Sequence, residues 1–105
     1  MDELMFLIEE TCRKLLAGKD NEFRECFEKT LREMMAIFPK LIVAYSNPTM
    51  SDMAQDAVYW PQQLERIIQT ADSQDKIALF DVLYSETYMN LIEVNGIMNE
   101  RKVLI

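Results

Sequence analysis

The sequence of 105 residues contains no histidine, which limits the chemistry that the chain can perform. The usual general base, the commonest metal ligand and the usual partner of a serine or cysteine nucleophile are therefore missing. Zinc sites built from Cys and His are excluded because the chain has only two cysteines. With two glycines it also has no Gly-rich phosphate-binding loop. Carboxylates remain as the candidates for catalysis or metal binding.

Three glutamates, Glu22, Glu25 and Glu28, follow one another at intervals of three residues. This spacing places carboxylates on one face of a helix, where they can hold Mg²⁺ for the hydrolysis of nucleoside triphosphates. A second acidic pair would have to face them, and the candidates are Asp72 with Asp75 and Asp81 with Glu86. The neighbouring side chains, which are Phe23, Arg24, Phe27, Lys29 and Arg32, favour a solvated face. A Mg²⁺-dependent phosphohydrolase that uses carboxylates only is therefore the alternative function.

Asp81 lies within the apolar run IALFDVLY. A buried carboxylate must be paired, because an unpaired one is expensive. The candidate donors are Tyr45, Tyr59, Trp60 and Lys40. We expect a structural hydrogen bond to one of these residues, ahead of plain exposure or a functional role.

Eight methionines are many for this length, and flexible Met side chains recur on surfaces that accept varied apolar partners. Filling of the core is the more common role for such residues. The candidate partner-binding set combines four methionines with one tryptophan, the aspartate of the apolar run and two apolar residues at the C-terminus. Its members are Met34, Met35, Met50, Met53, Trp60, Asp81, Leu104 and Ile105.

The apolar residues Val103, Leu104 and Ile105 follow the basic pair Arg101 and Lys102. We expect this tail to pack back on the protein or to dock on a second copy, so a homodimer is possible.

Four amphipathic helical patterns must position these residues. They run from about Asp2 to Ala17, from Asp20 through Pro39, from Thr49 through Pro61 to Ile68, and from about Gln74 to Asn99. In the fourth, steps of three and four predict one buried stripe of Ile77, Phe80, Tyr84, Thr87, Leu91, Val94 and Met98. Gly18, the SNPT loop of residues 46–49 and a polar turn of residues 70–75 separate the helices, with Asp72 or Ser73 as the N-cap of the last helix.

The short loops predict antiparallel neighbours. The fold class is therefore all-α, a single-domain four-helix antiparallel bundle over residues 1–105, with proline kinks in helices 2 and 3 at Pro39 and Pro61. Pro61 is also compatible with two short helices, the second beginning at this residue. A strand over residues 41–45 is the lesser alternative to helix.

The net charge of −7 and the lack of a basic stripe argue against nucleic acid and anionic membrane surfaces as partners. The N-terminus lacks a basic leader, and no stretch is apolar enough to span a membrane, so a cytoplasmic location is expected. Cys12 and Cys26 are interpreted as buried, reduced thiols, although a disulfide between neighbouring helices stays possible. No cofactor is expected.

The segment DKIALFDVLYSETYMNLIEV resembles a D-x-L-x-x-E pattern of small all-helical bacterial domains of uncharacterised function, through Asp81, Leu83 and Glu86 with Asp75 upstream. The resemblance covers about a quarter of the chain and implies a helical bundle and a bacterial source, but no activity. In size, acidity and number of helices the chain also resembles small helical secretion chaperones, a likeness of architecture only.

Together these observations predict a non-enzymatic cytoplasmic interaction module, adaptor-like or chaperone-like, with an apolar groove rimmed by acid. The expected partner is a protein or peptide, such as a basic or amphipathic helix, and its identity and pathway stay open.

Overall fold

The computed structural model describes all 105 residues and contains helices and turns but no strand. Its elements are α1 (Asp2–Leu16), α2 (Asp20–Ala44), the 3₁₀ helix η1 (Pro48–Val58), α3 (Tyr59–Asp72), α4 (Lys76–Phe80), the π-helix η2 (Asp81–Tyr88) and α5 (Met89–Glu100).

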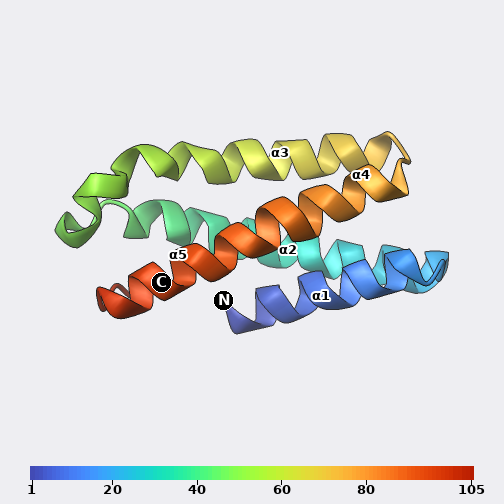
Figure 1. The fold of residues 1–105 in the computed structure, drawn as a ribbon, viewed down its shortest axis with the longest axis horizontal. Helices are drawn as coiled ribbons and strands as arrows, with labels where there is room; N and C mark the ends of the chain where they lie inside the picture. The colour runs from blue at the N-terminus through green and yellow to red at the C-terminus, as the bar shows by residue number, and fades with distance from the viewer.

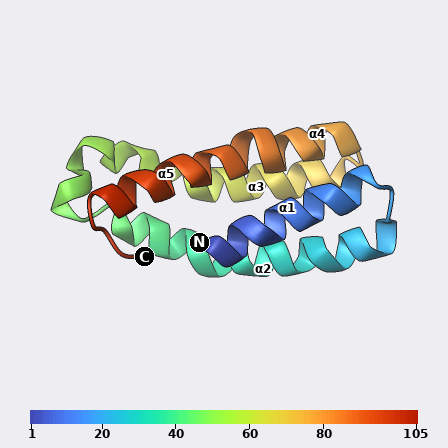
Figure 2. The same ribbon diagram turned by 60° about the horizontal axis from the view of Figure 1, so that its bottom comes forward.

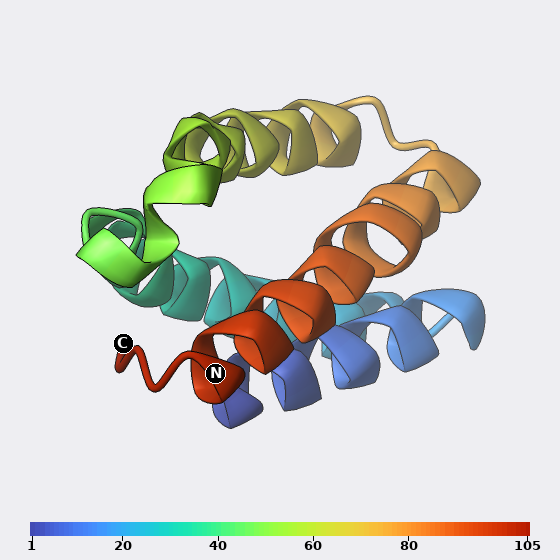
Figure 3. The ribbon, with the colours of Figure 1, turned by 60° about the vertical axis from the view of Figure 1, so that its left-hand side comes forward.

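These elements form four long rods, because η1 continues directly into α3, and α4, η2 and α5 follow one another without interruption (Figure 1). Successive rods run in opposite directions along a molecule of 44 × 22 × 20 Å. The predicted four-helix antiparallel bundle is therefore confirmed. Viewed towards one end, α1 and α2 lie side by side, with α3 and the α4–η2–α5 rod on the other side of the core (Figure 3).

Turns between the rods occur close to the predicted places. Gly18 adopts a φ of +72° between α1 and α2, a conformation that costs glycine little. Before the last rod, Gln74 has a φ of 61°, and Asp75 rather than Asp72 or Ser73 is the N-cap. The Asp75 carboxylate accepts a hydrogen bond of 3.0 Å from the backbone N–H of Ala78. The predicted cap is wrong because the turn continues for two more residues.

Both prolines lie inside the second and third helical segments, as the sequence predicts. Pro39 is exposed, and α2 runs through it from Asp20 to Ala44 without a break. The strand alternative for residues 41–45 is wrong, since 41–44 belong to this helix. Pro61 is the third residue of α3, in the first turn, where a missing N–H costs nothing. The rod thus changes from 3₁₀ to α-helix just before this proline. This is close to the interpretation of two short helices of which the second begins at Pro61.

The stripe expected in the fourth rod is correct only in its second half. Thr87, Leu91, Val94 and Met98 are buried, but Ile77 is 77% exposed. Tyr84 is also exposed, and the first buried residues are instead Leu79, Val82 and Leu83. The π-helix explains the shift, because its i→i+5 hydrogen bonds give wider turns than those of an α-helix. Side chains that face the core are therefore spaced by about four residues here, instead of by three and four in alternation. The Thr87 hydroxyl follows this pattern and donates a hydrogen bond of 2.8 Å to the Val82 carbonyl five residues earlier.

Residues after α5 return toward the bundle (Figure 2). Val103 is buried, and its N–H donates to the carbonyl of Met98 at 2.8 Å. Leu104 is 91% exposed and Ile105 is 39% exposed. The tail therefore packs back through one residue, while the other two line shallow surface grooves beside the end of α2 and the start of α1. None of the helices has the length and apolar character that crossing a bilayer requires.

Candidate functional site

The three glutamates of α2 are exposed, and each pairs with a basic residue nearby in the sequence. These ion pairs are Lys19–Glu22 at 3.7 Å, Lys29–Glu25 at 3.9 Å and Arg32–Glu28 at 3.4 Å. Nowhere in the structure do three or more His, Cys, Asp or Glu side chains gather as metal ligands would. The carboxylate-based alternative therefore has no observation in its favour.

Of the acidic residues expected to face these glutamates, Asp75 and Glu86 make other contacts, Asp75 as the N-cap described above. Glu86 accepts a hydrogen bond of 2.9 Å from Arg66 and one of 3.3 Å from the buried Gln63, which joins α3 to the π-helix. Asp81 is exposed and makes no hydrogen bond. The expected structural bond to Asp81 is wrong, because the side chain points to the solvated side of the rod while Val82 and Leu83 occupy the core.

The candidate methionines do not form one surface. Met34 and Met50 are completely buried and fill the core. Met35 is 62% exposed on α2. Met53 is partly buried and lines a hollow in the surface. Of this set, therefore, only Met53 lies at a concave site.

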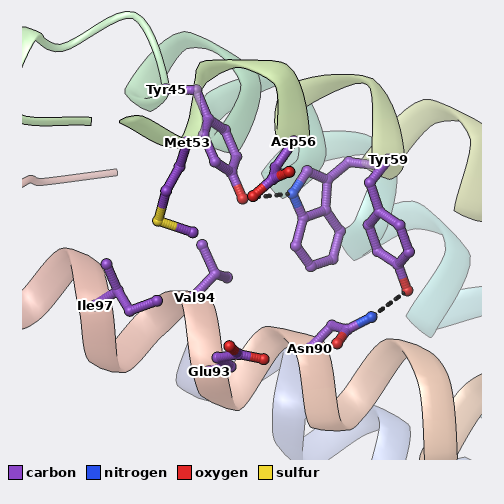
Figure 4. A pocket seen from close by; sticks show the side chains of 9 residues that line it. Tyr45, Met53, Asp56, Tyr59, Asn90, Glu93, Val94 and Ile97 are labelled. Atoms are coloured by element: carbon purple, nitrogen blue, oxygen red, sulfur yellow. Dashed lines mark hydrogen bonds between the residues drawn. The ribbon is translucent and has the colours of Figure 1, made fainter. Parts of the chain in front are cut away.

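This hollow, which we call the acidic hollow, lies between α5 and the η1–α3 rod and encloses about 180 Å³ (Figure 4). Its nine lining residues come from η1, α3 and α5 and from the residue after α2: Tyr45, Met53, Asp56, Tyr59, Trp60, Asn90, Glu93, Val94 and Ile97. Met53 and Trp60 belong to the predicted partner-binding set, and the other seven were not predicted.

The 3₁₀ geometry of η1 explains why one wall has this composition. In a 3₁₀ helix, residues three apart are eclipsed, so Met50, Met53, Asp56 and Tyr59 stand in one row along the rod. In an α-helix the same steps would rotate the row by about 60° each, because each residue turns about 100° instead of about 120°. The 3₁₀ helix thus directs an apolar, an acidic and an aromatic side chain to the same side.

An ion pair joins this wall to the end of α5. Arg101 donates to both carboxylate oxygens of Asp52, at 2.6 and 3.0 Å, and to the carbonyl of Thr49 at 2.9 Å. The Arg101 guanidinium holds the pKa of Asp52 below its usual range. These contacts fix the start of η1 against the C-terminal end of α5.

Tyr45, Trp60 and Val94 form the floor of the acidic hollow, since all three are buried. The indole N–H of Trp60 donates to the Tyr45 hydroxyl at 3.2 Å. Tyr59 stands on Trp60 edge to face, with ring centroids 4.8 Å apart, and its hydroxyl accepts a hydrogen bond of 2.7 Å from the Asn90 side-chain amide. Burial raises the pKa of both tyrosines, so both phenols are neutral at neutral pH.

Two carboxylates form the rim. Asp56 on η1 and Glu93 on α5 approach the hollow from opposite walls (Figure 4). Both are exposed, and neither takes part in any ion pair of the structure. After burial, the negative charges of Asp56 and Glu93 further raise the pKa of Tyr45. The floor is therefore apolar and aromatic, and it lies in the field of two unpaired negative charges.

The remaining predicted site residues lie elsewhere. Leu104 and Ile105 line the grooves beside the tail, and Asp81 stands on the outer side of the π-helix. The sequence did carry one signal for the acidic hollow. Met53, Asp56 and Tyr59 are spaced by three directly after a proline-started turn, a spacing typical of a 3₁₀ row. Glu93 and Asn90, more than thirty positions away, had no such signal.

Comparisons with protein-family models, with curated proteins and with solved structures found no match to this chain.

Proposed function

We propose that this protein is a non-enzymatic, cytoplasmic interaction module that binds a basic, amphipathic helix of a partner protein at the acidic hollow. The observation that carries the proposal is a concave aromatic surface with two exposed, unpaired carboxylates and no basic residue among its lining side chains. A net charge of −7 favours the approach of a basic partner in the same way.

The size of the hollow supports a protein partner over a free metabolite. Small-molecule sites usually enclose about 300–1,000 Å³. About 180 Å³ is enough for one side chain, so the rest of the ligand lies outside, on the surface around the rim. Met89, which is 48% exposed and precedes Glu93 by one turn of α5, adds area of the kind that the apolar face of a helix covers.

The test uses a synthetic helical peptide with Leu on one face and Lys on the other, and a control peptide in which every Lys is Glu. Trp60 is the only tryptophan and lies in the floor, so its fluorescence reports occupation of the hollow. We expect the basic peptide to bind with an affinity that falls as salt is added, and the acidic peptide not to bind.

A matched pair of variants locates the binding site. Glu93→Gln removes a rim charge, whereas Asp81→Asn removes an exposed, unpaired charge from the π-helix. We expect only the first to weaken peptide binding. Equal binding of both peptides, or equal effects of both variants, would refute the proposed function.

A further inference from the structure

We propose that the fourth rod exchanges between two registers. One is the arrangement described above, with η2 as a π-helix, which we call the π register. The other, the α register, has α-helical turns throughout, so that the first half of the rod is rotated about its axis. In the α register Ile77, Phe80 and Tyr84 face the core, and Leu79 and Val82 lie outside. The exchange hides or presents an apolar stripe of the surface, and it does not depend on the proposed function.

Two apolar stripes run along the rod and share the buried residues from Thr87 onward. Before this residue they diverge. The π register buries Leu79, Val82 and Leu83. Replacing the π-helix by an α-helix rotates the earlier residues by the angle of about one residue, roughly 100°, and brings the other stripe to the core. Leu83, four residues before Thr87, faces the core in both registers.

The π register has two disadvantages that the α register removes. Helices with i→i+5 hydrogen bonds are rare and occur mostly as single turns, whereas η2 has eight residues. In addition, Ile77 is 77% exposed and Tyr84 is 39% exposed. The α register buries these side chains, but it must also fit the ring of Phe80 into the core in place of Leu79. These opposing costs bring the two registers close in free energy.

The exchange leaves the buried hydroxyl of the rod hydrogen bonded. The Thr87 hydroxyl donates to the carbonyl of Val82, five residues earlier, at 2.8 Å. The hydroxyls of three other helical threonines lie within hydrogen-bond distance of the carbonyl four residues earlier: Thr11, Thr30 and Thr70. In the α register the Thr87 hydroxyl reaches the carbonyl of Leu83 in this way. The hydrogen bond of 2.9 Å from Gln63 to Thr87 persists, because Thr87 lies where the two registers meet.

The polar contacts at the start of the rod are weak enough to follow the rotation. The turn before it is exposed, and Gln74 has a φ of 61°, in the left-handed region that is unfavourable for residues other than glycine. An exposed ion pair of 3.2 Å joins Lys76 to Asp20 of α2, and such pairs contribute little to stability.

The first experiment measures how fast maleimide labels a cysteine placed at Ile77 or at Val82, with each site resolved by mass spectrometry. Without further substitution we expect Ile77→Cys to be labelled at least about tenfold faster than Val82→Cys, because only Ile77 is exposed. Leu79→Gln places a polar group in the core of the π register but near the surface of the α register. It should therefore slow labelling of Ile77→Cys and accelerate labelling of Val82→Cys, each by at least about threefold.

Leu83→Gln is the matched control, because it places the same polar group in the core of both registers. We expect it not to slow labelling of Ile77→Cys. If Leu79→Gln accelerates labelling at both positions, the start of the rod unfolds locally and the second register is refuted. Labelling rates that Leu79→Gln leaves unchanged refute it as well.

The second experiment needs no substitution in the core. Shifts of helix register occur in microseconds to milliseconds, so NMR relaxation dispersion should be present at residues 76–86 and absent along α5. Deletion of the exposed Ser85 gives Leu79, Leu83 and Thr87 the spacings of an α-helical stripe, so the dispersion should disappear in this variant. Dispersion that is absent from the intact chain, or that persists after the deletion, would overturn the inference.

Discussion

Replacing the buried Thr11 and Thr30 by valine, singly and together, tests how the first two helices are held together. Both side chains are fully buried, and their hydroxyl oxygens are 2.8 Å apart across the α1–α2 interface. Each hydroxyl is also within hydrogen-bond distance of a carbonyl of its own helix, Thr11 of Leu7 at 2.7 Å and Thr30 of Cys26 at 2.9 Å. Because a hydroxyl has one hydrogen, one of the two donates across the interface while the other donates to its own carbonyl. Valine has the same shape as threonine, so the substitutions remove hydrogen bonds without creating a cavity.

The size of each effect follows from these contacts. In either single variant the remaining hydroxyl keeps a carbonyl acceptor on its own helix, so no buried donor is left unpaired. Each single substitution should therefore reduce the free energy of unfolding by only about 0.5–1.5 kcal/mol. Both singles lose the shared bond, but the double variant loses it once. The double loss should thus be smaller than the sum of the single losses by about 0.5–1.5 kcal/mol.

The assay is urea unfolding followed by circular dichroism, which for a chain of this size yields free energies under a two-state analysis. Thr70→Val is the matched control, because its hydroxyl bonds only to the Arg66 carbonyl of its own helix. We expect no coupling between Thr70 and Thr11. If the losses for Thr11 and Thr30 add within about 0.3 kcal/mol, the two hydroxyls do not interact and the reasoning is refuted.

Three further predictions concern other parts of the molecule. Leu91→Ala should cost about 2–5 kcal/mol of stability, and Ile77→Ala less than about 0.5 kcal/mol, in the same urea assay; a large loss for Ile77 would contradict the π-helix register. A hydrogen bond to Glu9 raises the pKa of Tyr88 to about 12. The stabilisation that this hydrogen bond gives the folded protein is therefore fully present below about pH 10 and is lost as the pH rises through about 12. Absorbance titration of tyrosinate should show this ionisation moving toward pH 10 in Glu9→Gln, and an unchanged titration would refute the contact. Burial raises the pKa of the Cys12 thiol to about 12, so maleimide labelling of Cys12 followed by mass spectrometry should be slow in the native protein and fast in urea; rapid native labelling would contradict its burial.

The sequence predicted the fold well because the helical periodicity, the turn residues and the short loops all agree. The predicted buried stripe is wrong at Ile77 and Tyr84, because the prediction used the same number of residues per turn throughout the fourth rod. A signal for the wider turn was present, because Leu79, Leu83 and Thr87 are spaced by four. Thr87 could equally belong to either spacing, so the pattern alone does not choose between them.

The site was harder to predict than the fold. Met53 and Trp60 were proposed from residue type alone, and they do line the acidic hollow. Met34 and Met50 were proposed on the same grounds and are core residues. The charged half of the hollow depends on Glu93, which approaches Asp56 only after the fourth rod has folded back along η1. Such a contact across the bundle has no counterpart in local spacing.

A 3₁₀ helix of eleven residues also has a kinetic consequence for the acidic hollow. Runs beyond three or four residues are uncommon because their hydrogen bonds are poorly aligned, so η1 should exchange its amide protons sooner than α2. The affinity of a ligand is reduced by the fraction of molecules in which this wall is open. Substitutions on the outer side of η1, such as Gln55→Ala, would then change residence time without touching the ligand. Residues outside the hollow can therefore change the affinity for the ligand by changing how long the 3₁₀ conformation of η1 persists.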